Sequence, residues 1–272
     1  MNLRVSRRRC KYMKLGVCRG ADSFEQFACI KKAGFDYVEV SFSGLYYIEE
    51  EKYKLFLKAL SELNFPCEAA NCFIPGEFKL VGDSVDYDAL SKYLEFTFER
   101  AQRAGIKVVV FGSGGARSYE DGFSPEKAYE QLVYFTRNYA SPAAKKYGCR
   151  IAIEPLRFEE SKQIHTVADG VKLALDSTCD NVRGLADIYH VYHNNDSIEG
   201  IASFKNMVIH GHISNPFDRY YPLDDNEYDY SVFLRAMRDA GCERCSVEGR
   251  TDDIEKDVTV AAGVLRRALA RI

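Results

Sequence analysis

The chain has 272 residues, of which 46% are hydrophobic and 28% are charged, and its net charge is −3. This composition predicts a folded protein with a substantial core, because disordered chains contain few apolar residues. The slightly acidic balance lacks the basic surface that nucleic-acid-binding proteins use, so we expect no nucleic-acid partner. No apolar run approaches the roughly 20 residues that a membrane-spanning helix needs, so we expect no membrane partner either.

The first 12 residues are rich in arginine and are not followed by an apolar stretch of signal-peptide length. We interpret residues 1–12 as a disordered tail, or as a start codon assigned too early with Met13 as the true start. The nine cysteines are an odd number without a secretory signal, which is typical of reduced thiols in the cytoplasm. Cys242 and Cys245 have the spacing of half a zinc site, but they stand alone, and core packing is the preferred interpretation.

Eight short apolar segments alternate with longer amphipathic segments along the chain. Short runs rich in Val, Ile, Ala and aromatic residues are typical of buried parallel strands. Strands are expected at residues 14–18, 36–41, 66–71, 107–112, 149–154, 182–187, 206–213 and 244–248. Helices are expected at residues 23–33, 49–63, 87–104, 125–147, 166–175, 197–203, 230–240 and 253–270.

These eight strand-then-helix units predict an α/β fold, a single (β/α)8 TIM barrel over residues 13–272. Several expected helices end at a glycine, such as Gly34 or Gly105, which accepts the positive φ of a helix stop. An open doubly wound sheet would carry a glycine fingerprint after its first strand. The glycine turn at residues 112–115 follows the fourth strand and lacks that spacing, so it indicates a turn near a substrate instead.

Four polar residues fall at the C-terminal ends of the last four expected strands: Glu154, Asp187, His212 and Glu248. Active sites of barrels are built at that end, and neighbouring strands would bring the four side chains to one side of the mouth. Crowded carboxylates raise one another's pKa unless a cation neutralises them. Three carboxylates and an imidazole suit one divalent metal ion; Mn²⁺ is favoured, with Mg²⁺, Co²⁺ or Zn²⁺ as alternatives. A carboxylate that caps a loop or pairs with an arginine would explain one such residue. These roles explain less well why polar residues stand at four consecutive strand ends.

The segments around these residues resemble the xylose-isomerase-like TIM-barrel superfamily, and within it the sugar (phosphate) isomerase/epimerase group. The similarity runs in order from residue 14 to the C-terminus. It is carried by Ile153-Glu154-Pro155-Leu156, by Leu185-Ala186-Asp187-Ile188-Tyr189-His190, by His210-Gly211-His212-Ile213 and by Ser246-Val247-Glu248-Gly249. The turn from Gly112 to Arg117 and the pair Arg219 and Pro222 resemble the same group.

The resemblance implies that Glu154, Asp187, His212 and Glu248 are the metal ligands, with Glu154 and Glu248 also forming the catalytic acid/base pair. It further implies that His190 and Arg219 contact the substrate.

Four other residues are open in their roles. Glu159 resembles a substrate-binding glutamate, although the family's Glu-Pro-Leu-Asn-Arg is Glu154-Pro155-Leu156-Arg157 here, as if one residue were missing. Asn71, at the end of the third strand, and Glu39, in the second, are substrate-binding candidates with inward polar packing as the alternative. His210 points to the same side of its strand as His212, where it would line the barrel or support a ligand.

The implied activity is that of a divalent-metal-dependent isomerase or epimerase acting on a ketose or related sugar. Such an enzyme abstracts an α-proton through a metal-stabilised enediolate. A lyase acting on an inosose or a 3-oxo sugar, by dehydration or C-glycoside cleavage, begins with the same step and is the alternative. A nuclease resembling endonuclease IV would need histidines after the third and fourth strands, where residues 71–74 and 111–113 have none. We expect a cytoplasmic protein with a small-molecule sugar substrate, and leave formation of a homo-oligomer open.

Overall fold

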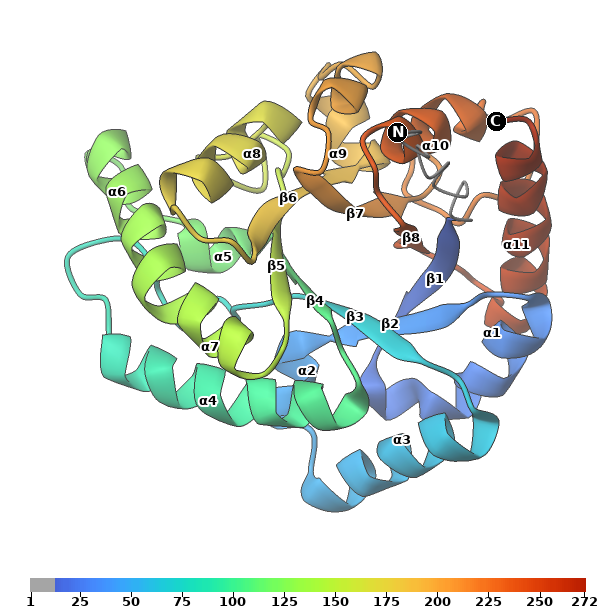
Figure 1. Ribbon diagram of the computed structural model, residues 1–272, viewed down its shortest axis with the longest axis horizontal. Helices are drawn as coiled ribbons and strands as arrows, with labels where there is room; N and C mark the ends of the chain where they lie inside the picture. The colour runs from blue at the N-terminus through green and yellow to red at the C-terminus, as the bar shows by residue number, and fades with distance from the viewer. Residues whose placement is uncertain (1–12) are drawn as a thin grey trace, which may run out of the picture.

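Eight parallel strands pair in chain order and close into a barrel in the computed structural model, which describes residues 13–272 (Figure 1). The barrel closes because β1 pairs with both β2 and β8. The expected TIM barrel is confirmed, and the expected tail at residues 1–12 lies outside the described residues. The strands are β1 Lys14–Arg19, β2 Tyr37–Ser41, β3 Cys67–Asn71, β4 Val108–Phe111, β5 Arg150–Ile153, β6 Val182–Asp187, β7 Val208–Ile213 and β8 Arg244–Val247.

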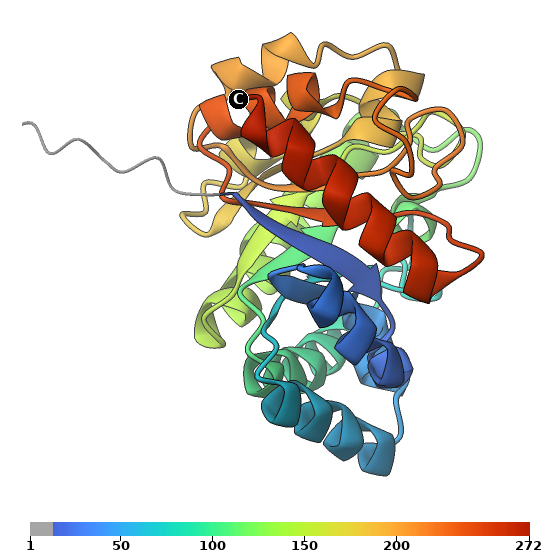
Figure 2. The same ribbon diagram turned by 90° about the vertical axis from the view of Figure 1, so that its right-hand side faces the viewer.

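Helices surround the barrel, and the last one packs beside the first, which completes the outer ring (Figure 2). The helices are α1 Phe27–Ala33, α2 Phe42–Tyr47, α3 Glu50–Leu63, α4 Tyr87–Ala104, α5 Gly114–Arg117, α6 Pro125–Phe135, α7 Ser141–Lys146, α8 Val167–Asp176, α9 Ile188–His193, α10 Tyr230–Asp239 and α11 Ile254–Ala270. The 3-10 helices η1 Ala21–Gln26 and η3 Glu199–Ser203 and the π-helical turn η2 Thr136–Ala140 complete the set.

The observed helices differ from the expected ones in three respects. The helix expected at residues 23–33 is α-helical only from Phe27, after the 3-10 helix η1, and the one expected at residues 197–203 is the 3-10 helix η3. The long helix expected at residues 125–147 is divided by η2, directly before Pro142 in the first turn of α7. Proline has no N–H to donate, so the regular hydrogen-bond ladder is interrupted there. The helices α2, α5 and α9 were not expected, because four to six residues are too few to show a helical period.

Side chains inside the barrel form two layers, since alternate residues of a strand point inward. One layer is an apolar cluster separate from the core beneath the helices, made of Tyr37, Ala69, Val108, Val110, Ala152 and Leu185. The hydroxyl of Tyr37 lies 2.7 Å from Oγ of Ser246 on β8, so the ring lies over the intervening strand β1. A Cβ atom on Gly16 would lie 2.3 Å from that ring, so only glycine leaves room for it.

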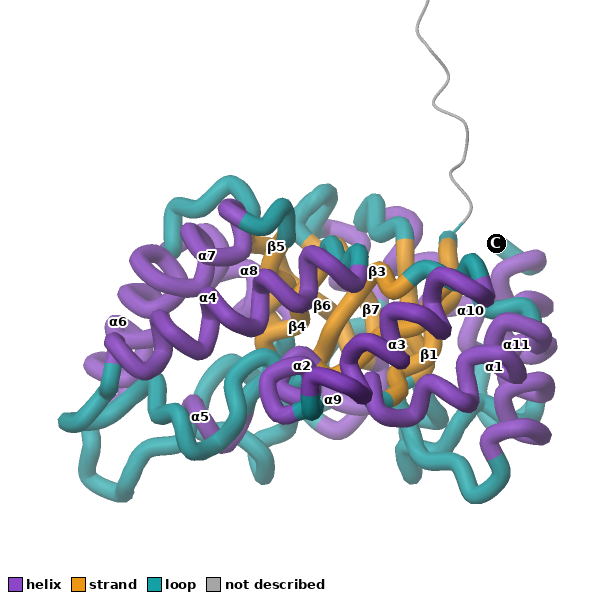
Figure 3. The backbone as a smooth tube through the Cα atoms, turned by 90° about the horizontal axis from the view of Figure 1, so that it is seen from below, coloured by secondary structure: helices purple, strands orange, loops and turns teal. Residues whose placement is uncertain are grey.

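A polar layer lies two residues further along β2, β5 and β6. Tyr37 is followed by Glu39, Ala152 by Glu154, and Leu185 by Asp187. This layer therefore faces the C-terminal ends of the strands, where Figure 3 shows loops together with the short helices α5 and α9.

No helix within residues 13–272 is long and apolar enough to span a bilayer. The eight cysteines of this part of the chain are free, and both Cys242 and Cys245 belong to the hydrophobic core. Core packing of that pair is therefore confirmed.

Candidate metal centre

The four residues expected to bind a metal come together at the C-terminal mouth of the barrel. Each of Glu154, Asp187, His212 and Glu248 offers one ligand atom, and these atoms all lie within 4.8 Å of one another. Asp187 and His212 belong to β6 and β7, whereas Glu154 and Glu248 directly follow β5 and β8. Four neighbouring strands thus form a single group of donors that could hold a metal ion.

His212 lies at the centre of this group and is fully buried. Its Nδ1 atom is 2.9 Å from Oε1 of Glu154 and 3.2 Å from Oε2 of Glu248. The same atom is 3.9 Å from Oδ2 of Asp187. One edge of the imidazole therefore faces all three carboxylates.

The electrostatics of the group indicate a shortage of positive charge. Burial raises the pKa of Asp187 to about 7, against the lowering effect of Arg219, and neighbouring Glu248 and Glu154 raise it further. Burial also raises the pKa of the Glu154 carboxyl. The pKa of Glu248 is held well below its usual value despite burial, because His212 and Arg219 lie beside it.

His212 shows the complementary effect. Burial alone would lower the pKa of its imidazole, but the carboxylates of Glu248, Glu39 and Glu154 hold that pKa well above its usual value. A divalent cation would supply the missing positive charge and let all three carboxylates ionise together. The donor set, oxygen-rich with one imidazole nitrogen, fits such an ion.

Two side chains hold the acidic members of the group in place from outside it. Nδ2 of Asn71 donates to Oε1 of Glu248 over 2.6 Å, so the predicted Asn71 does reach the site. The buried guanidinium of Arg117 donates to the main-chain oxygen of Glu154 over 3.2 Å. A Cβ atom on Gly112 would lie 2.3 Å from Oε2 of Glu154, which explains a glycine at this position.

Arg219 reaches the carboxylates from the loop between β7 and α10. Its Nη2 atom is 2.8 Å from Oε2 of Glu248 and 3.4 Å from Oδ2 of Asp187, and its guanidinium lies over the ring of Tyr189. Its backbone has a φ of +64°, a left-handed conformation that is uncommon for a residue with a side chain. Hydrogen bonds of its N–H to Asn215 and of its carbonyl to Arg250 hold this conformation.

His190 lies one helical turn after Asp187 and is buried beside it. Its Nδ1 atom accepts a hydrogen bond of 3.3 Å from the backbone N–H of Arg157. Burial, reinforced by Arg219, lowers the pKa of His190 to about 3, so its imidazole is neutral at neutral pH. The proton then resides on Nε2, which has no hydrogen-bond partner within residues 13–272.

The structure does not bring Glu159 into this group, because its side chain is exposed. Its neighbour Glu160 accepts hydrogen bonds from Nε of Arg157, over 2.7 Å, and lies 4.0 Å from Nη1 of Arg219. Glu160 was not among the residues predicted from the sequence, because the segment after Leu156 was aligned with the family motif as if one residue were missing. Treating Arg157 as a substitution, without a gap, would have selected Glu160.

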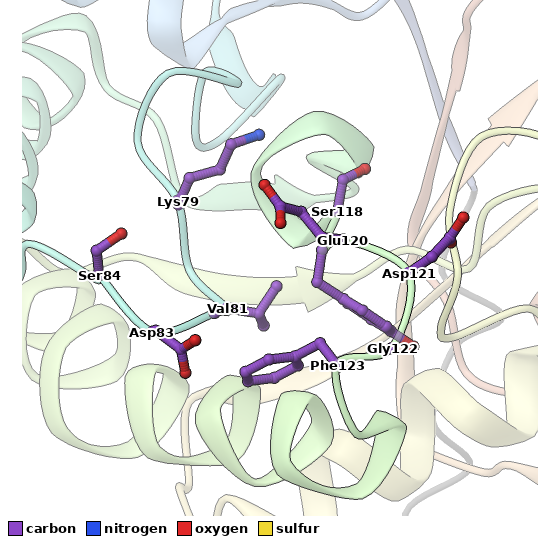
Figure 4. Close-up of a pocket in the computed structure, with 11 residues that line it drawn as sticks. Lys79, Val81, Asp83, Ser84, Ser118, Glu120, Asp121, Gly122 and Phe123 are labelled. Atoms are coloured by element: carbon purple, nitrogen blue, oxygen red, sulfur yellow. The ribbon is translucent and has the colours of Figure 1, made fainter.

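A separate cavity of about 500 Å³ lies between the loops that follow β3 and β4 (Figure 4). Its walls carry both charged and aromatic side chains, including Lys79, Asp83, Glu120 and Phe123. None of the four candidate ligands lines it, so this cavity is not part of the metal centre.

The family model of the xylose isomerase-like TIM barrel matches residues 27–268, and the chain belongs to this family. Solved structures share the fold along nearly the whole chain. The 3-keto-D-glucoside 4-epimerase YcjR from E. coli is 20% identical with a TM-score of 0.77, covering 94% of this chain and 99% of its own. An L-ribulose 3-epimerase is 15% identical with a TM-score of 0.80, and 95% of each chain is covered.

A D-allulose 3-epimerase from Methylomonas sp., in complex with D-allulose, is 15% identical with a TM-score of 0.79, covering 95% of this chain and 98% of its own. A comparison with curated proteins gives no match. At these identities the structural likeness establishes the barrel fold, and the family model establishes the family.

The close contact between Gly112 and Glu154 yields the first prediction. We expect Gly112→Ala to weaken metal binding roughly tenfold, because overpacking costs about 1–3 kcal/mol and ~1.4 kcal/mol corresponds to tenfold in affinity. Titration with Mn²⁺, following the free ion by electron paramagnetic resonance, measures the change. Gly76→Ala is the control, since its new Cβ would meet nothing closer than 3.8 Å. Equal affinity of Gly112→Ala and wild type would contradict the proposed contact.

The raised pKa of Asp187 yields the second prediction. Because its folded-state pKa of about 7 exceeds the ordinary value of 3.8, its protonation stabilises the metal-free fold below about pH 4, and this contribution is lost as pH rises through 7. An asparagine in its place would still accept the hydrogen bond from the Tyr189 N–H but would carry no charge. We therefore expect metal-free Asp187→Asn to be more stable than wild type at pH 8, on the order of a few kcal/mol, with the difference vanishing toward pH 4.

Thermal unfolding of both metal-free proteins across this pH range tests the second prediction. A difference in melting temperature that stays constant with pH would show that Asp187 does not titrate as described.

Proposed function

We propose that this protein is a divalent-metal-dependent epimerase or isomerase acting on a ketose or related keto-sugar, with Mn²⁺ as the favoured ion. The observation that carries the proposal is the position of two glutamates around one buried histidine. Glu154 and Glu248 both lie within 3.2 Å of Nδ1 of His212, on strands that are three apart around the barrel. Family membership and the likeness to sugar epimerases support it.

Epimerisation and isomerisation both require removal of a proton from a carbon next to a carbonyl. When bound by Glu154, Asp187, His212 and Glu248, a divalent ion supplies Lewis-acid stabilisation of the negative charge that develops on the substrate oxygens. One of the two glutamates removes the proton, and the other returns a proton to the opposite face or to the neighbouring carbon. Asn71 holds the carboxylate of Glu248 in position for this role.

His190, Arg219 and Glu160 form the proposed substrate-binding side of the mouth. The free Nε2–H of His190 can donate to a sugar oxygen. The guanidinium of Arg219 can donate to hydroxyl groups, and Glu160, held by Arg157, can accept from them. The free cysteines fit a reducing compartment, so a cytoplasmic location remains part of the proposal.

The nuclease alternative gains no support from the structure. Besides the four-residue group, the described residues contain one further cluster with metal-binding potential, formed by Cys18, Glu39 and His212. It shares His212 with the first group. A nuclease resembling endonuclease IV would hold three zinc ions and need additional ligands where β3 and β4 end, and Asn71 and Gly112 occupy these positions.

The acid/base assignment yields the third prediction. We expect the wild type to bind one Mn²⁺ per chain. The rate of α-proton exchange should fall at least ~100-fold in Glu154→Gln and in Glu248→Gln, since an amide cannot accept the proton. Nuclear magnetic resonance of candidate ketoses and 3-keto-glucosides incubated in D₂O measures the exchange. Near-normal exchange in either variant would remove that glutamate from the pair. Analysis of the products then separates epimerisation from elimination, because a lyase shares the exchange step.

The substrate-binding residues yield the fourth prediction. His190→Ala and Arg219→Ala should keep the bound metal while lowering kcat/KM roughly 10- to 100-fold, the value of one hydrogen bond involving a charged or buried group. His193→Ala is the matched control, because His193 is exposed on the same helix. Loss of metal from His190→Ala would make His190 a ligand, and unchanged kinetics of Arg219→Ala would remove Arg219 from the site.

A further inference from the structure

Glu39 is a fully buried carboxylate in β2, inside the barrel and behind the metal centre. Both of its oxygens are occupied by imidazoles of β7. Oε2 lies 2.7 Å from Nε2 of His210, and Oε1 lies 3.0 Å from Nε2 of His212. The two histidines are alternate residues of one strand, so the single carboxylate links β2 to β7 across the interior of the barrel.

This arrangement determines which nitrogen of each histidine carries a proton. An ionised carboxylate can only accept hydrogen bonds, so each Nε2 atom that faces Glu39 must be a donor. Loss of the remaining proton from His212 therefore occurs at Nδ1, which points at Glu154 and Glu248, and leaves the lone pair there. That is the state in which an imidazole binds a metal ion.

His210 strengthens the arrangement without taking part in the metal centre. Its Nδ1 atom has no hydrogen-bond partner within the described residues, and its ring meets that of His212 edge to face with centroids 5.2 Å apart. Its hydrogen bond keeps the Glu39 carboxylate from turning away from His212, because each oxygen already has a fixed donor.

We propose that Glu39 is a positioning residue that fixes the orientation and tautomer of His212, so that Nδ1 is presented to the metal ion. The inference rests on the proposed metal centre and adds to it a residue that would not touch the ion. It also accounts for the cluster of Cys18, Glu39 and His212 without a second ion. A metal ion there would have to displace the Nε2 protons that Glu39 accepts.

The test compares Glu39→Gln with the matched control Tyr37→Phe. Glutamine has one accepting oxygen and one NH2 group, so it cannot accept from both histidines. Tyr37 is buried on the same strand and the same side, and its hydroxyl contacts Ser246 instead of a histidine. Both substitutions alter one buried hydrogen-bonded group in the barrel, but only one of them touches His212.

We expect Glu39→Gln to bind Mn²⁺ 10- to 100-fold more weakly, the usual effect of losing a carboxylate behind a ligating histidine, while Tyr37→Phe binds it like wild type. Equal affinity of Glu39→Gln and wild type would overturn the inference and leave the metal centre standing. Failure of the wild type to bind Mn²⁺ would overturn both. Binding of two ions per chain by wild type and only one by Glu39→Gln would assign Glu39 to a second metal site instead.

A measurement on the wild type alone keeps the inference testable if Glu39→Gln does not fold. Long-range ¹H–¹⁵N spectra report the tautomer of each of the five histidines, here in the Zn²⁺-loaded protein. We expect His212 to be protonated on Nε2 and to bind zinc through Nδ1. Binding through Nε2, with the proton on Nδ1, would overturn the inference.

Discussion

The crowding of three carboxylates around one buried imidazole is the constraint on which the rest of this mouth depends. Glu154, Asp187 and Glu248 cannot all ionise in a buried space without positive charge beside them. The chain supplies part of that charge through Arg219, and the raised pKa values of Asp187 and Glu154 show that it does not suffice. The amide of Asn71 donates a hydrogen bond to Glu248, and the absence of a side chain at Gly112 leaves room for the carboxylate of Glu154.

The pleat of the strands separates the group of carboxylates from the apolar layer inside the barrel. Because alternate residues point inward, a step of two residues on β2, β5 and β6 leads from the apolar layer around Tyr37 to Glu39, Glu154 and Asp187 of the polar layer. The apolar layer closes the barrel beneath the site. The polar layer needs no separate scaffold, since the same strands that pair below position the charged groups above.

The strands and the group of possible metal donors could be predicted from the sequence for the same reason. A buried parallel strand is a short apolar run, and a charged residue at its end is visible without knowledge of distant contacts, as with Glu154 and Asp187. Glu160 does not end a strand, so this pattern does not select it, and its position depends on how the loop after β5 folds against Arg157. The role of Glu39 was equally hidden, since a glutamate inside a strand acquires a meaning only when β7 brings two histidines to it.

The left-handed backbone at Arg219 has a consequence for exchanging loops between members of this fold. The carbonyl of Arg219 accepts a hydrogen bond from Arg250, and a Cβ atom on Gly249 would lie 2.6 Å from that carbonyl. The loop after β7 therefore fits only against a β8 loop that has a glycine beside it. A loop exchange intended to alter sugar preference would therefore have to transfer both loops together. The segment to exchange runs from residue 215 to residue 250.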